Sequence, residues 1–362
     1  MGPIKFLLLV FMIMLAIGLF AHVQTIPALL SVSGRDSWIT IIVTVLPMIL
    51  WLFILGKLVK LSGKISVTDW KENLSPFRYY LLVGPFVLYL IFSAFITSKD
   101  IVIWSHISYI PDIKYEIIVI VFLFICYLGT KSGTQSLAIL SGILLPLVVV
   151  LGIFVMTVNV KNKQYELLFP IFEDGYMPIL NGLIYTMLPL VELFIIMIIP
   201  HVDNKTMTTK KIFLIGGIIV GLMLGPTIGA ITEFGPDQAS IYRYPAFEQW
   251  RILTIGNYFS HVDFFAIYQW LAGGVLRTSL YVLIASYLLT RKKQKKYTVI
   301  SIYLVLMIGC FYRIDQHTFY EFVYTFFMPA SLLVLTIQLA ILFVFLTLQN
   351  HKKKLEKVKQ DG

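Results

Sequence analysis

MPILNGLIYTMLPLVELFIIMIIP, residues Met177–Pro200, is long and apolar enough to cross a lipid bilayer, because about 20 residues at about 1.5 Å each span the hydrocarbon core. Two residues are unusual in a plain spanning helix. Pro189 removes a backbone N–H and frees the carbonyl of Tyr185. Glu192 places an acid inside the apolar run, at a cost of about 2.5–3.5 kcal/mol without a partner. An interrupted helix with a buried carboxylate is typical of a binding-site wall; the alternative is a proline kink beside a protonated or structurally paired acid.

The composition of the whole chain is that of a membrane protein. Of the 362 residues, 58% are hydrophobic and 13% are charged, and the mean hydropathy is +0.85. These values exclude the soluble classes and predict an all-α polytopic membrane protein. The net charge of +10 does not predict nucleic-acid binding, because the Lys and Arg residues form short clusters between apolar segments. Cys126 and Cys310 lie in apolar segments and are predicted as core residues, not as a disulfide or a metal site.

Ten apolar segments are predicted to span the membrane, the first without cleavage as a signal peptide. With the N-terminus in the cytoplasm, cytoplasmic connections hold most of the 29 basic residues, so both termini are expected there. Residues 1–349 are expected to form a single transmembrane domain, and residues 350–362 a basic tail that is a topology anchor or binds anionic lipid. The predicted spans are residues 4–30, 37–61, 78–105, 115–130, 135–158, 178–200, 210–231, 262–289, 297–311 and 319–348.

The first and sixth predicted spans are both interrupted. In the first, the polar side chains of residues 21–25 (AHVQT) precede Pro27 and predict that the helix unwinds there. The two spans lie five apart and begin on opposite sides of the membrane. This arrangement predicts an inverted five-plus-five repeat, about 4–158 and 178–348, with a site at the membrane midplane where the interrupted helices 1 and 6 face each other.

Arg277 lies near mid-depth in the predicted span 262–289, about 18 Å from its inner end at the rise of an α-helix. Glu192 lies about 11 Å from the inner end of its own span. Opposite charges at this depth need each other or water. We therefore predict that Glu192 and Arg277 pair or share a hydrated cavity. In the alternative interpretation, Arg277 is a fixed cation in the place where related folds hold a sodium ion.

The predicted ligand site combines these two charges with polar and small residues of neighbouring segments. Tyr89, Ser93 and Thr97 share one face of span 78–105 at four-residue spacing. His22 is predicted either as a hydrogen-bonded core histidine or as a proton carrier. The predicted ligand-binding residues are Gly18, His22, Gln24, Thr25, Tyr89, Ser93, Tyr185, Pro189, Glu192, Trp270, Gly273 and Arg277.

Two further patterns predict local packing. Glycines at four-residue spacing in span 210–231 predict a face that lets another helix approach closely; they are Gly217, Gly221, Gly225 and Gly229. Residues 247–253 (FEQWRIL) predict an amphipathic interfacial helix in a long connection.

No known enzyme motif is present in the sequence. It contains no Gly-rich phosphate loop, HExxH, GxSxG or paired His/Cys cluster. We therefore predict that the protein is not an enzyme and has no catalytic residue, no metal site and no cofactor.

Three stretches carry a resemblance to a known family. They are IPALLSVSGRDSWIT (Ile26–Thr40), YELLFPIFEDGYMPILNG (Tyr165–Gly182) and YPAFEQWRILTIGNYFSHVDFFAIYQWLAGGVLRTSLYV (Tyr244–Val282). They resemble the spore germination permease family, the B-type subunits of nutrient germinant receptors within the amino acid–polyamine–organocation superfamily. The resemblance implies a ten-helix inverted-repeat (LeuT-like) fold in the inner membrane of a bacterial spore. It also implies A-type and C-type partner subunits, and a small nutrient, commonly an amino acid, bound between spans one, three, six and eight.

The sequence departs from this family at the interruption of the first span. Many members have a Gly-x-Gly pattern there, which frees backbone for a ligand carboxylate. Here Gly18 is displaced, and Phe20 and His22 occupy the nearest positions. The resemblance favours a germinant-sensing subunit that binds a nutrient and triggers germination through its partners. The alternatives are a proton- or cation-coupled amino acid transporter and a scaffold that holds partner subunits without binding a ligand.

Overall fold

The computed structural model describes residues 4–62, 70–71, 74–200, 202, 207–254, 262–290 and 295–361, and every regular element within them is a helix. Within these described residues, eight helices are long and apolar enough to cross a membrane. The chain is therefore an all-helical, multi-pass membrane protein. One of the eight, Phe6–Ser62, covers the first two predicted spans, and the shorter apolar helix Lys296–Phe311 covers the predicted ninth span.

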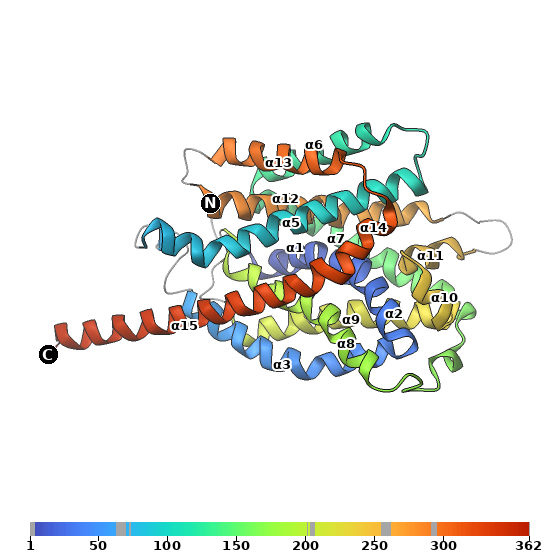
Figure 1. Cartoon of the computed structure of the whole chain (residues 1–362), viewed down its shortest axis with the longest axis horizontal. Helices are drawn as coiled ribbons and strands as arrows, with labels where there is room; N and C mark the ends of the chain where they lie inside the picture. Colours follow the sequence, from blue (N-terminus) through green and yellow to red (C-terminus); the bar gives the residue numbers. More distant parts are fainter. Residues whose placement is uncertain are drawn as a thin grey trace.

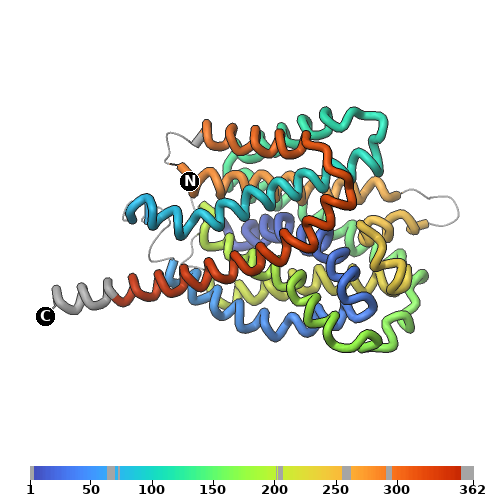
Figure 2. Tube along the Cα trace, in the orientation of Figure 1, coloured from blue at the N-terminus to red at the C-terminus, as the bar shows by residue number. Residues whose placement is uncertain are grey.

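The predicted unwinding of the first span is wrong. Helix α1 (Phe6–Leu19) continues through a π-helical segment, η1 (Phe20–Thr25), into α2 (Ile26–Ser33). Pro27 lies at the start of α2, where a missing N–H costs little, and the wider π-helical turn keeps the polar residues in a helix. Gly34, at φ 49°, ends α2. The chain then reverses its direction before α3 (Ser37–Ser62), as Figure 2 shows.

The sixth span also remains helical, but it changes its helical type. Helix α8 (Met177–Val191) ends two residues after Pro189, and a 3₁₀-helix, η5 (Glu192–Met197), follows directly. The tighter 3₁₀ turn begins at the buried acid itself. Both predicted interruptions are thus changes in helix geometry, and neither is an unwound loop.

The remaining helices complete one bundle, and α10, α11 and α14 gather at its right-hand end in Figure 1, called here the α11 end. Helix α15 continues past the predicted domain boundary at residue 349. The bounds are α5 (Pro76–Ser108), α6 (Tyr115–Ser132), α7 (Thr134–Val158), η3 (Asn159–Asn162), η4 (Tyr165–Leu168), α9 (Thr209–Phe234), α10 (Pro236–Ile241), α11 (Pro245–Arg251), α12 (Phe264–Leu289), α13 (Lys295–Phe311), α14 (Gln316–Glu321), the π-helical η7 (Phe322–Phe327) and α15 (Met328–Asp361).

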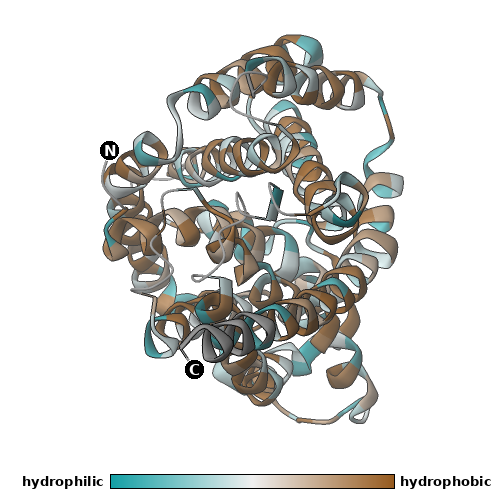
Figure 3. Cartoon of the chain, turned by 90° about the vertical axis from the view of Figure 1, so that its left-hand side faces the viewer, coloured by the Kyte–Doolittle hydropathy of each residue, from teal (hydrophilic) through white to brown (hydrophobic). Residues whose placement is uncertain are grey.

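Burial distinguishes central helices from those that face lipid. In the most apolar window of α12, 83% of the residues are buried, whereas the corresponding share for the Thr134–Asn162 helix is 17%. Large apolar side chains such as Leu46, Ile143 and Ile308 are exposed on outer helix faces, as expected where lipid is the solvent, and apolar residues dominate the helices in Figure 3. Helix α12, which carries Arg277, is therefore at the centre of the bundle.

The predicted glycine face of α9 is only partly a packing face. A Cβ atom added at Gly217 or Gly221 would meet no atom within 4 Å. A tight contact of α9 with α3 lies one residue earlier, because a Cβ atom at Gly216 would lie 2.6 Å from Leu52 Cδ1. At the far end of the helix, a Cβ atom at Gly229 would lie 2.3 Å from Gln249 Nε2. Neighbouring residues point about 100° apart around a helix, so a four-residue repeat did not identify the face that packs.

This difference predicts unequal effects for two neighbouring substitutions. Gly216→Val should lower the free energy of unfolding by about 1–3 kcal/mol, because the added carbons overpack the contact with Leu52. Gly217→Val, the matched control, should change it by less than about 0.5 kcal/mol, since the position is open. Unfolding of the purified protein in detergent measures both. Equal losses would contradict the assignment of the packing face.

Candidate functional site

The predicted pairing of Glu192 and Arg277 is confirmed. Arg277 Nη2 lies 2.6 Å from Glu192 Oε1, and Arg277 Nη1 lies 2.9 Å from Glu192 Oε2. Both side chains are fully buried. The two parallel contacts make the bidentate geometry in which a guanidinium and a carboxylate bind most strongly.

Three elements, α1, α5 and α12, supply the remaining hydrogen bonds of the pair. Glu192 Oε1 accepts from the Tyr89 hydroxyl of α5 at 2.5 Å. The Arg277 guanidinium also lies over the rings of Phe20 and Tyr281, 4.6 Å and 4.4 Å from their centroids. Its nitrogen atoms donate to Thr97 Oγ1 (3.1 Å), Ser93 Oγ (2.6 Å), the Ala16 carbonyl (2.9 Å) and the Tyr281 hydroxyl (2.7 Å).

The Ala16 contact depends on the change of helix type in the first span. The N–H of Phe20 bonds to the carbonyl of Ile17, one residue out of α-helical register. The carbonyl of Ala16 accepts from Arg277 instead. Arg277 therefore joins the α1–η1 junction to Glu192, which stands at the α8–η5 junction. The two predicted interruptions meet at one side chain.

A second polar cluster lies along α5, one helical turn beyond Thr97 and nearer to the α11 end. Asp100 is 1% exposed. Its Oδ1 atom accepts from Arg243 Nη2 (3.0 Å) and the Tyr244 hydroxyl (2.9 Å), and its Oδ2 atom accepts from Gln24 Nε2 (3.1 Å). The Tyr244 hydroxyl also bonds to the hydroxyl of Tyr320. These five residues, Gln24, Asp100, Arg243, Tyr244 and Tyr320, are called the Asp100 cluster.

Aromatic rings surround the cation of this cluster. The Arg243 guanidinium carbon lies 3.7 Å from the centroid of the Tyr320 ring and 4.6 Å from that of Tyr244, within the range of cation–π attraction. Burial, together with the negative charge of Asp100, raises the pKa of the Tyr244 hydroxyl well above its ordinary value. Tyr244 therefore stays protonated and can donate its hydrogen bond to Asp100.

Of the predicted site residues, Tyr89, Ser93, Glu192 and Arg277 meet at the buried pair, and Gln24 belongs to the Asp100 cluster. The others lie around these two groups.

Three predicted site residues make helix contacts instead. His22 lies against the backbone of Leu222 in α9, and a Cβ atom at Gly18 would lie 3.1 Å from Leu222 Cδ1. A Cβ atom at Gly273 would lie 2.9 Å from Leu19 Cβ. These positions let α9 and α12 approach the first span closely.

The last four predicted residues are buried near the two polar groups. The Tyr185 hydroxyl donates to the Tyr324 carbonyl at 3.3 Å, and Pro189 is buried one turn before Glu192. The Thr25 hydroxyl is buried without a hydrogen-bond partner among the described residues. Trp270 stacks on Trp104, with centroids 4.0 Å apart.

Sequence reasoning missed most of the Asp100 cluster. Asp100 is a charged residue inside the predicted span 78–105, which is a usable signal for an intramembrane site. It lies near the predicted end of that span, where charged residues also mark the membrane boundary. Arg243 and Tyr244 precede α11 in a connection, where charged and aromatic residues are common, so no local pattern identifies them.

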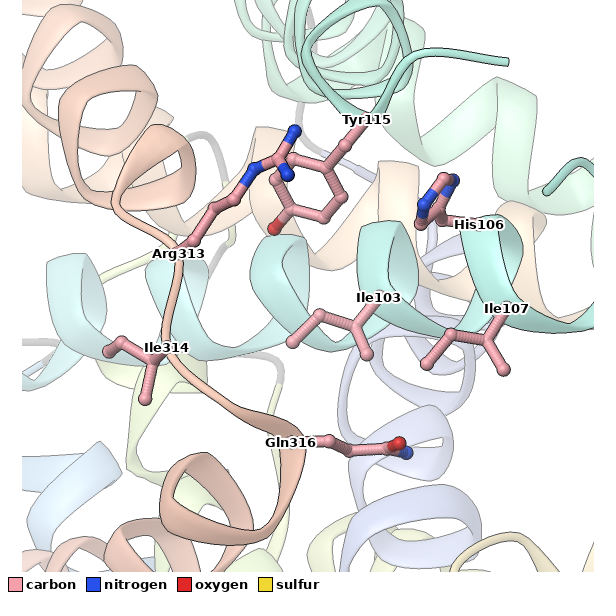
Figure 4. A pocket seen from close by; sticks show the side chains of 7 residues that line it. All are labelled: Ile103, His106, Ile107, Tyr115, Arg313, Ile314 and Gln316. Carbon is pink, nitrogen blue, oxygen red and sulfur yellow. The ribbon is translucent and has the colours of Figure 1, made fainter. Parts of the chain in front are cut away.

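A cavity of about 180 Å³ lies between α5, the start of α6 and the connection from α13 to α14. Figure 4 shows Arg313 and Tyr115 on one side and His106 on the other. The residues that line it are Ile103, His106, Ile107, Tyr115, Arg313, Ile314 and Gln316. None of them belongs to the predicted ligand site.

Comparison with known proteins gives two findings. Residues 2–319 match the family described as "Spore germination protein". The "Spore germination protein XB" of Bacillus anthracis is 38% identical over 340 residues, which cover 93% of this chain and 96% of that protein.

The geometry of the pair predicts strong coupling between its members. Glu192→Gln and Arg277→Gln should each lower the free energy of unfolding by about 3–5 kcal/mol, because each leaves a buried charge without its partner. The double variant should lose far less than the sum of the two. Unfolding in detergent measures all three.

A control for this cycle is the pair Glu248–Arg251 on α11, whose side chains are 20% and 59% exposed. Glu248→Gln and Arg251→Gln should each cost less than about 1 kcal/mol. Strictly additive losses at Glu192 and Arg277 would refute their coupling.

Proposed function

The chain belongs to the spore germination protein family, and we propose that it is the germinant-sensing membrane subunit of a spore nutrient receptor. In this proposal, a small nutrient, an amino acid, binds in the middle of the bundle. Binding changes the packing of the first and sixth spans, and A-type and C-type partner subunits transmit the change. The membrane is the inner membrane of the spore.

The observation that carries this proposal is the way in which Arg277 joins two helix junctions. Ionisable residues inside a membrane protein are costly and usually mark solute or ion pathways. Here one side chain bonds to the Ala16 carbonyl at the α1–η1 junction and to Glu192 at the α8–η5 junction. A solute that disturbs either contact must alter the other helix as well. Such a link suits a sensor, whose task is to convert binding into a change of packing.

The proposed topology has ten spans in an inverted five-plus-five repeat. The Phe6–Ser62 run would cross the membrane twice, since the chain reverses near Gly34, and α13 would supply the short ninth span. With both termini in the cytoplasm, the α11 end faces away from the cytoplasm. A germinant that reaches the spore membrane from outside would then meet the Asp100 cluster before it meets the Glu192–Arg277 pair.

The test uses the full-length protein in sealed liposomes, with a pool of labelled amino acids and an imposed proton gradient. We expect saturable binding without accumulation inside the liposomes. Glu192→Gln should weaken this binding at least about tenfold, which is about 1.4 kcal/mol. Tyr89→Phe removes only the hydroxyl that bonds to Glu192 and is a second, milder variant. Glu166→Gln, at an exposed position, is the control and should bind as the wild type does.

The other outcomes distinguish the alternative functions. Gradient-driven accumulation that is lost in Glu192→Gln would identify a coupled amino acid transporter. The absence of binding and accumulation, with the partner subunits also present, would favour a scaffold and refute the sensing role.

A further inference from the structure

The Asp100 cluster contains buried polar atoms that lack hydrogen bonds. Among the described residues, Arg243 Nε, Arg243 Nη1 and Gln24 Oε1 are buried and have no hydrogen-bond partner. Each such atom costs about 1–3 kcal/mol of desolvation, and more where the group is charged. Arg277 differs in this respect, because all three of its guanidinium nitrogens donate hydrogen bonds. The Asp100 cluster therefore has polar atoms without hydrogen bonds, whereas every guanidinium nitrogen of Arg277 has one.

The unpaired atoms define the chemistry of the missing partner. The free nitrogens of Arg243 are cationic donors, which bind carboxylates best. The free oxygen of Gln24 is an acceptor. Both side chains hydrogen-bond to the same Asp100 carboxylate, one to each oxygen, so a single small ligand can contact both. A suitable partner has an anionic acceptor and a donor on adjacent atoms.

The neighbouring backbone does not offer a competing site for an anion. The segment η1, which carries Gln24, remains helical, so its N–H groups are directed along the helix. The free donors lie on the Arg243 side chain instead. The rings of Tyr244 and Tyr320, on which Arg243 rests, also present faces that attract an ammonium group.

We propose that the Asp100 cluster recognises a zwitterionic α-amino acid, with Arg243 donating to its carboxylate and Gln24 Oε1 accepting from its ammonium group. This inference rests on the proposed solute-sensing function and adds a recognition site that the solute meets before it reaches the Glu192–Arg277 pair. The carboxylate accepts from Arg243 Nε and Nη1, and Arg243 Nη2 keeps its bond to Asp100 Oδ1.

The accessible side of the cluster supports this assignment. The Arg243 side chain is 15% exposed, whereas that of Asp100 is 1% exposed. Arg243 lies outside the spanning helices, between α10 and α11. A solute that arrives at the α11 end therefore meets the cation before the buried carboxylate.

The experiment measures the binding of each labelled proteinogenic amino acid to the full-length protein in lipid nanodiscs, with the matching α-carboxamide as competitor. The amide keeps the ammonium group and the side chain but lacks the negative charge. For an amino acid that binds, the amide should bind about 10- to 100-fold more weakly, the effect of losing charge-assisted hydrogen bonds. This comparison uses the wild-type protein and does not depend on the folding of any variant.

Variants then test whether Arg243 is the residue that distinguishes the amino acid from its amide. Arg243→Gln should bind the acid and the amide with similar affinity. Arg243→Lys keeps the charge without the planar fork and should retain part of the preference. Arg251→Gln, on the neighbouring helix α11, removes an exposed cation and should leave the preference unchanged. Unfolding in detergent verifies that each variant is folded.

The outcomes separate this inference from the proposed function. Amino acid binding in which acid and amide are equal, or in which Arg243→Gln keeps the full preference, would overturn the inference and leave sensing intact. Ordered water would then occupy the unpaired positions. Binding confined to solutes without a carboxylate would overturn it in the same way. The absence of binding for any labelled amino acid, sugar or nucleoside, with partner subunits present, would overturn both.

Discussion

An ionised side chain inside a bilayer must be paired, hydrated or neutralised, and this constraint governs the centre of the protein. The mutual attraction of Glu192 and Arg277 has to compensate the desolvation of two charges, which requires good geometry and additional hydrogen bonds. The structure meets both requirements through bidentate contact and through α5, which contributes Tyr89, Ser93 and Thr97. The changes of helix type in the first and sixth spans lie where this network needs a backbone carbonyl and a correctly placed carboxylate.

The two polar groups are neighbours along the same pair of helical segments. On α5, Thr97 bonds to Arg277, and Asp100 follows on the next turn. On η1, the Phe20 ring lies against Arg277, and Gln24 bonds to Asp100 one turn later. A displacement of η1 relative to α5 therefore changes both groups. These direct contacts form a continuous route from the α11 end to the centre of the bundle.

The sequence alone predicts the parts of this arrangement that follow from the cost of placing a charge inside a lipid bilayer. A charge at mid-depth is rare enough that Glu192 and Arg277 could be paired from their depths alone. The type of helix at the interruptions was not predictable, because proline and polar residues are compatible with unwound, π-helical and 3₁₀ geometry. The prediction of the packing face of α9 failed for a different reason, because glycines occur both where helices touch and where they do not. Helix α11 was expected at the membrane interface, but its residues Phe247 and Trp250 are buried in the protein.

The π-helical geometry of η1 determines how a change of helix type would move the residues that follow it. A π-helical turn contains more residues than an α-helical turn, so converting this segment to a regular α-helix would shift its register by about one residue. Such a shift turns the following helix by about 100° and moves it by about 1.5 Å along its axis. Gln24 lies in this segment, and a second π-helical segment, η7, carries Tyr324, whose ring lies 5.2 Å from the Arg243 guanidinium. The cluster is thus contacted from two sides by π-helical segments, and a change of either one to α-helical geometry would move a residue that touches the cluster.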